Sequence, residues 1–176
     1  MICERQGDMS KPGIHSGKIA YANQDYIVAK IKYLISADPE NTNANKTERV
    51  ALVEGLNTLP LSARESTAAY AEQLTAELYE FTDLYRGNKR PPKQVVVDRV
   101  ISFSPEDKVT PELALEIVKK AVAKVMKPID RRLGLFAVHT DKDHTHVHFL
   151  ISTLCMDGKI FNPRDDDKIW NKEMNN

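Results

Sequence analysis

The sequence predicts an α+β fold in which helices cover a central antiparallel sheet. Segments with a helical apolar stripe are interspersed with short segments rich in Val and Ile. Two of the predicted strands are separated by a turn too short for a parallel crossover, which favours an antiparallel hairpin. No repeat, low-complexity segment or clear linker interrupts the 176 residues, so we expect a single domain, residues 1–176.

The N-terminal part of the chain is predicted to contain three helices. Residues 1–18 are polar and are expected to be irregular. Residues 24–36 predict an amphipathic helix, which the turn-rich segment DPENTNAN ends. Residues 46–56 are interpreted as a short helix. Ser62 and Glu65 resemble a capping box, from which a long helix would run to about residue 84.

The following segment alternates strand and helix. Residues 94–103 (QVVVDRVISF) are rich in Val and Ile and predict a strand. Thr110 followed by Pro111 is a typical helix start, and the helix should end near Met126, before Pro128. Its apolar positions fall on one side, as expected for a helix that covers a sheet.

The last predicted strands, residues 133–139 and 147–154, form a hairpin closed by a short turn. A second tight turn at 156–159 leads to a short strand at 160–161. The final residues, DKIWNKEMNN, resemble the start of a helix. We therefore expect the chain to be the N-terminal part of a longer protein.

Charge and composition restrict the function only weakly. The 25 basic and 25 acidic residues cancel, which counts mildly against a nucleic-acid partner, although residues 86–99 and 119–132 are locally basic. No apolar run of about 18 residues occurs, so no membrane insertion is expected. The segment before residue 14 does not resemble a secretory signal. The distant Cys3 and Cys155 suggest a reducing compartment, and we expect a cytoplasmic protein.

Four of the five histidines lie within ten residues, in the segment HTDKDHTHVH. Side chains alternate along a strand, so His146 and His148 face the same side, and His139 lies across the hairpin from them. Three imidazoles converging from adjacent strands suit a divalent ion. Asp141 and Asp143 are candidates for orienting a ligand imidazole. His144 lies in the turn and is the weakest candidate ligand.

A tyrosine is a candidate nucleophile for attack on a phosphate held at such an ion, because it can form a covalent intermediate. Tyr33 lies about 160° and Tyr26 about 140° from the centre of the apolar stripe of the first helix. Both therefore project from its polar face, where they are surface residues or stack on bases.

These residues carry a family resemblance. HTDKDHTHVHFLIS resembles the third motif of the mobilisation relaxases, in the HUH endonuclease superfamily, and is most similar to the clade of the T-DNA border endonuclease. VAKIKYLISADPE resembles the first relaxase motif, a helix with a catalytic tyrosine near its end. One departure is Ser152, which stands where the family often has an asparagine.

The resemblance implies a sheet of about five strands and a site at its centre. It implies that His139, His146 and His148 bind Mg²⁺ or Mn²⁺ and that Tyr33 is the nucleophile, with Tyr26 second. One related clade uses an N-terminal histidine instead, which makes His15 a third candidate. Asp141 is a candidate for orienting a histidine or assisting proton transfer. The implied activity is nicking and religation of single-stranded DNA at the transfer origin of a mobile element, through a 5′-phosphotyrosine. Accessory DNA-binding proteins and a type IV secretion coupling protein are the implied partners.

Other functions remain as alternatives. A rolling-circle replication initiator shares the metal site but places its tyrosine after the histidines, and the last tyrosine here is Tyr85. A metal-dependent single-strand nuclease would use water and leave no covalent intermediate. A non-catalytic metal-binding or DNA-binding module would not cleave DNA with any ion.

Overall fold

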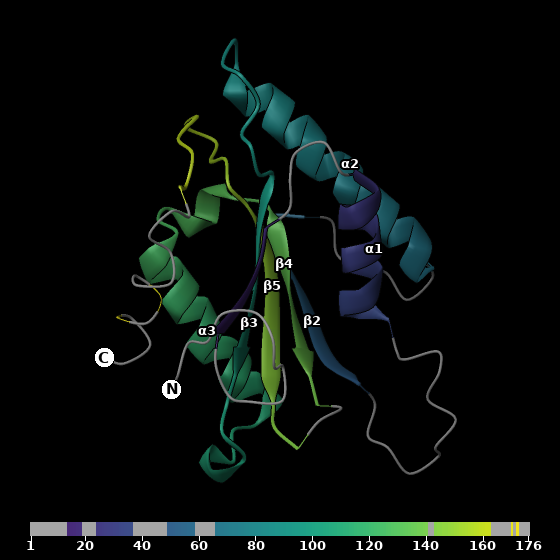
Figure 1. Ribbon diagram of the computed structural model, residues 1–176, viewed down its shortest axis with the longest axis vertical. Coiled ribbons are helices and arrows are strands. Elements are labelled where there is room, and N and C mark those ends of the chain that lie inside the picture. The colour runs from purple at the N-terminus through teal and green to yellow at the C-terminus, as the bar shows by residue number, and fades with distance from the viewer. Residues whose placement is uncertain are drawn as a thin grey trace.

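The computed structural model describes residues 14–18, 24–36, 49–58, 66–140, 143–162, 170 and 172. A central antiparallel sheet is covered by α1 and α2 on one face and by α3 on the other (Figure 1). The predicted class, an α+β fold with an antiparallel sheet flanked by helices, is confirmed.

The strands of the sheet follow the order β1-β3-β5-β4-β2, and each neighbouring pair is antiparallel. In β1, only the backbone is described. The pair β4–β5 is the predicted hairpin. The strand bounds are Ile14–Lys18 for β1, Val50–Leu56 for β2, Val96–Ser102 for β3, Gly134–His139 for β4 and His146–Ser152 for β5.

Three α-helices are described: α1 spans Gln24–Ile35, α2 Thr67–Arg86 and α3 Pro111–Val125. The hydroxyl of Thr110 accepts a hydrogen bond from the backbone N–H of Leu113, so α3 begins at the predicted cap. Ser66 caps α2 by accepting from the N–H of Ala69. The predicted cap at Ser62 and Glu65 lies outside the described residues. Short 3₁₀ turns occupy Pro105–Asp107 and Ile129–Arg131.

Two apolar cores lie on opposite faces of the sheet because alternate strand residues point to opposite sides. On β4, Leu135 and Ala137 pack toward α1 and α2, whereas Phe136 and Val138 pack toward α3. His139 follows the parity of Leu135 and Ala137. The side chain at the end of β4 therefore projects toward the face that α1 covers.

Two local predictions from the sequence are wrong. Residues 50–56, interpreted as part of a helix, form β2, and residues 14–18, expected to be irregular, form β1. Both strands lie at the edges of the sheet. The burial of β2 does not alternate cleanly, so its sequence lacks the period of two that identifies a half-buried strand.

Gly134 is expected to be required for the approach of β4 to β5. A Cβ atom at this position would lie 2.8 Å from the Cα of Ile151 and would overlap the carbonyl oxygen of Leu150, both backbone atoms. Gly134→Ala should therefore lower the free energy of unfolding by about 1–3 kcal/mol, the usual cost of overpacking. A urea titration measures the change. An unaltered midpoint would contradict the expected clash.

Candidate active site

The three histidines of the predicted metal site lie at one end of the β4–β5 hairpin. His139 ends β4 and pairs directly with His146, the first residue of β5. His148, two residues further along β5, pairs with Ala137 and shares the parity of His146. All three side chains are buried. The alternation of side chains along the hairpin thus brings them to one face.

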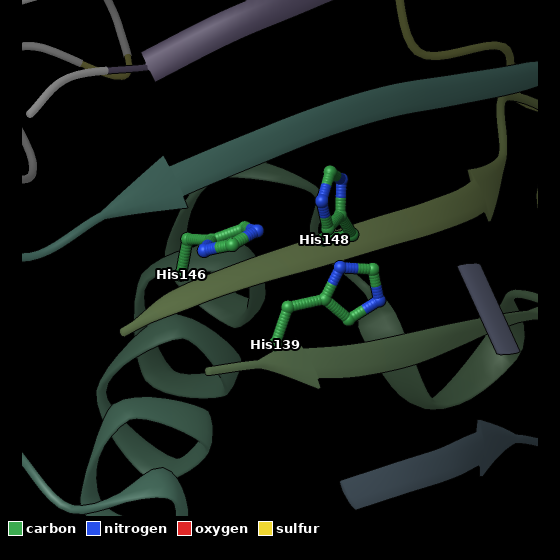
Figure 2. A group of neighbouring side chains, drawn as sticks. All are labelled: His139, His146 and His148. Atoms are coloured by element: carbon green, nitrogen blue, oxygen red, sulfur yellow. The ribbon is translucent and has the colours of Figure 1, made fainter. Parts of the chain in front are cut away.

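The imidazole rings converge on a common point between the strands (Figure 2). Each ring offers one nitrogen to a set of atoms that all lie within 4.8 Å of one another. The centroid of the His139 ring lies 4.6 Å from that of His148 and 5.2 Å from that of His146. This is the spacing expected of three ligands around one metal ion.

His139 is oriented by the backbone of α1. Its Nε2 donates a hydrogen bond to the carbonyl oxygen of Leu34, at 2.8 Å. This bond places the proton on Nε2 and directs Nδ1, with its lone pair, toward His148 (Figure 2). A histidine that binds a metal through one nitrogen commonly donates the other N–H to a carbonyl in this way.

His148 gives the strongest indication that these residues fit a metal ion. Both of its ring nitrogens are buried, and neither has a hydrogen-bond partner among the described residues. An unpaired buried nitrogen destabilises a protein unless a ligand binds it. Burial, followed by the charges of neighbouring groups, lowers the pKa of His148 well below its usual range. The ring is therefore neutral near pH 7, the form that binds metal ions.

Tyr33 lies beside this cluster. Its ring centroid is 6.1 Å from that of His139 and 6.0 Å from that of His148. Its side chain is 43% exposed, as predicted for the polar face of α1. A phosphate bound at the histidines would thus have an accessible phenol next to it.

Arg49, just before β2, contacts Tyr33 in two ways. Its guanidinium carbon lies 4.0 Å from the centroid of the Tyr33 ring. Its NH1 nitrogen donates to the carbonyl oxygens of Tyr33 and Ser36, at 3.0 and 3.3 Å. The sequence alone does not indicate this residue, because a single arginine between two segments carries no pattern.

An ion pair between the half-buried Lys30 and the buried Asp98 also lies near Tyr33. Lys30 Nζ is 3.0 Å from a carboxylate oxygen of Asp98 on β3 and 5.5 Å from the centre of the Tyr33 ring. Burial raises the pKa of Asp98, while Lys30 acts in the opposite direction. One oxygen of Asp98 is buried with no hydrogen-bond partner among the described residues. Sequence analysis missed this pair, which forms only when α1 packs on the sheet.

Other predicted residues lie elsewhere. Tyr26 is 45% exposed and lies two helical turns before Tyr33, about 10 Å along α1. Asp141 lies outside the described residues, and Asp143 is exposed. His144 is buried, and its ring centroid lies 5.6 Å from that of His146. It does not belong to the set of three histidines whose nitrogens all lie within 4.8 Å of one another.

Two of the remaining candidates are placed by their strands. His15 is on β1 and pairs with Val100 of β3. Ser152 is four residues beyond His148, about 13 Å along β5. Its hydroxyl accepts from the N–H of Leu133 and donates to the carbonyl of Leu154. These bonds secure the end of the hairpin far from the histidines.

Comparison with known proteins identifies a family. The family model described as "Relaxase: MobA/VirD2-like, nuclease domain" matches residues 36–176, which include all three clustered histidines. The match begins three residues after Tyr33, so it does not cover the candidate nucleophile. No curated protein matches the chain. Among the described helices, none is long and apolar enough to cross a membrane.

Proposed function

Because the chain belongs to the MobA/VirD2-like relaxase family, we propose that it nicks and religates single-stranded DNA at a transfer origin. The cleavage forms a covalent bond between Tyr33 and the 5′ phosphate of the cut strand. The reaction takes place in the cytoplasm and initiates conjugative transfer of a mobile element. Accessory DNA-binding proteins and a secretion coupling protein are its partners in that process.

The observation that carries the proposal is the position of Tyr33 beside the three histidines. His139, His146 and His148 hold a divalent ion, Mg²⁺ or Mn²⁺, which neutralises charge on the scissile phosphate when bound. The ring of Tyr33 is about 6 Å from two of these imidazoles. A phosphate bound at the histidines is thus within reach of the phenolic oxygen, as in-line attack requires.

The proposed reaction conserves the number of phosphoester bonds. The phenolic oxygen of Tyr33 bonds to phosphorus while the bond from phosphorus to the 3′ oxygen breaks. A carboxylate or solvent takes the phenol proton, and the departing 3′ oxygen gains a proton. Asp141 is proposed to assist proton transfer or to orient a histidine. Attack by a 3′ hydroxyl on the phosphotyrosine reverses the reaction and rejoins the strand.

Local charge supports DNA binding by a chain whose net charge is zero. Lys30 places a cation 5.5 Å from the centre of the Tyr33 ring. Positive groups at a phosphate site favour binding even where the whole molecule is neutral. The proposed substrate is single-stranded or extruded, because one phosphate must reach both the histidine site and Tyr33.

The test is incubation of the protein with labelled single-stranded oligonucleotides from the element's own transfer origin. Products formed with Mn²⁺ and with EDTA are separated on a denaturing gel before and after protease treatment. A metal-dependent band that protease shifts supports a relaxase, because it contains DNA bound to protein. Free cut ends with no protein attached would instead identify a hydrolytic nuclease and refute the covalent step.

Tyr26→Phe is expected to retain cleavage and the protein–DNA adduct, within about threefold of the unaltered rate. Tyr26 lies about 10 Å along α1 from Tyr33, so we expect its hydroxyl not to reach the same phosphate. The Phe ring still stacks on a base if Tyr26 serves that role. Single-turnover kinetics with Mn²⁺ measure the rate. Loss of the adduct in this variant would make Tyr26 the nucleophile.

A further inference from the structure

We propose that Arg49 is a positioning residue that fixes the C-terminal end of α1 and the ring of Tyr33 relative to the histidines. This inference rests on the proposed function, in which Tyr33 attacks the phosphate. Arg49 is only 7% exposed, and its guanidinium contacts the last turn of α1. Its role would be to hold the nucleophile, without contacting DNA.

The geometry at the end of α1 supports this role. The last carbonyl groups of a helix have no partners within the helix and need donors from outside. Arg49 donates to the carbonyls of Tyr33 and Ser36, and His139 donates to the carbonyl of Leu34. Three carbonyl groups within four residues therefore accept hydrogen bonds from side chains outside the helix.

The two donors come from neighbouring segments, the residue before β2 and the last residue of β4, so they form one frame. The carbonyl oxygen of Arg49 accepts a hydrogen bond from the N–H of Thr140, at 2.9 Å, immediately after His139. The backbone that carries Arg49 is thereby connected to the backbone that carries a metal ligand. A shift of the last turn of α1 would move Tyr33 with respect to the metal site and would strain both anchors.

The guanidinium also limits rotation of the Tyr33 ring. Its central carbon lies 4.0 Å from the centre of the Tyr33 ring, while the rings of His139 and His148 make edge contacts with Tyr33. A planar guanidinium stacks on an aromatic face and binds two acceptors at once, which a lysine does not do. Arg49 thus restricts both the backbone and the side chain of the proposed nucleophile.

The experiment compares Arg49→Lys and Arg49→Ala with Arg132→Lys. Arg132 is a matched control: it is also buried and also donates to backbone carbonyls, those of Met126, Ser152 and Thr153, but at the far end of the hairpin. Three quantities are measured: the melting temperature, the Kd for an uncleaved single-stranded oligonucleotide in EDTA, and the single-turnover rate of adduct formation at saturating DNA with Mn²⁺.

We expect Arg49→Lys to slow adduct formation by about 10- to 100-fold, the effect of misplacing a reacting group by about 1 Å. The oligonucleotide Kd should stay within about threefold of the unaltered protein, and Arg49→Ala should be slower than Arg49→Lys. Arg132→Lys should lower the melting temperature without changing the rate for folded protein. An equal rate loss in both lysine variants, a weakened Kd with an unchanged saturated rate, or no change would overturn the proposal.

A second measurement needs no DNA and therefore separates this inference from the proposed function. The change in melting temperature caused by Arg49→Lys is measured in the unaltered protein and in a Tyr33→Ala background. A smaller change in that background shows that Arg49 and Tyr33 are coupled. Additive changes would refute the positioning contact, even if the protein forms the covalent adduct. Absence of any adduct from the unaltered protein would refute the proposed function instead.

Discussion

Tyr33→Phe is expected to abolish the covalent protein–DNA adduct, with a loss of about 10⁴-fold or more in the rate of its formation. Deleting a covalent nucleophile typically has effects of this size or larger. Phenylalanine keeps the ring, so its packing against His139 and the stacking of Arg49 should remain. The assay is the denaturing gel with Mn²⁺, run on both proteins at equal concentration.

The same variant discriminates between the chemical alternatives. The hydroxyl is removed from a side chain that is 43% exposed, so the free energy of unfolding should change by about 0.5 kcal/mol or less. Metal affinity should also be unchanged, because the variant keeps all three imidazoles of the histidine cluster. If Tyr33→Phe cleaves DNA at the original rate, water, Tyr26 or His15 performs the attack, and the assignment of Tyr33 is wrong.

The position of the histidine cluster could be predicted because it depends on local rules. Strand alternation places His146 and His148 on one side, and a hairpin of the expected length places His139 opposite them. The exposed position of Tyr33 follows from helical periodicity in the same way. Each of these arguments needs only residues that are close together in the sequence.

The features that sequence analysis missed depend on contacts between distant segments. Arg49 meets Tyr33 because β2 pairs with β4 at the edge of the sheet. Asp98 meets Lys30 because α1 packs on the face of the sheet to which Asp98 points. The strand that follows Arg49 was itself interpreted as a helix, since an edge strand with partly exposed positions has no clear period. An error in one edge strand thus concealed the contact between Arg49 and Tyr33.

Replacing His148 by leucine is expected to abolish stabilisation by metal and to reduce metal affinity by about 100-fold or more. Removing even a residue that only orients a ligand costs about 10- to 100-fold, and loss of a ligand itself should cost at least as much. His144→Leu is the matched control. It also removes a buried imidazole, four residues from His148, but leaves His139, His146 and His148 in place. Calorimetric titration with Mn²⁺ measures both affinities.

Stability without metal distinguishes a metal site from a merely structural histidine cluster. In EDTA, the unaltered protein keeps both nitrogens of His148 buried without partners among the described residues, at a cost of about 1–3 kcal/mol for each group. His148→Leu removes this cost, so it should be at least as stable as the unaltered protein in EDTA. With Mn²⁺ at 100 times its Kd, only the unaltered protein should gain about 2.7 kcal/mol. A variant that is much less stable in EDTA, or an unaltered protein that gains nothing from Mn²⁺, would mean that the three imidazoles serve packing and do not form a metal site.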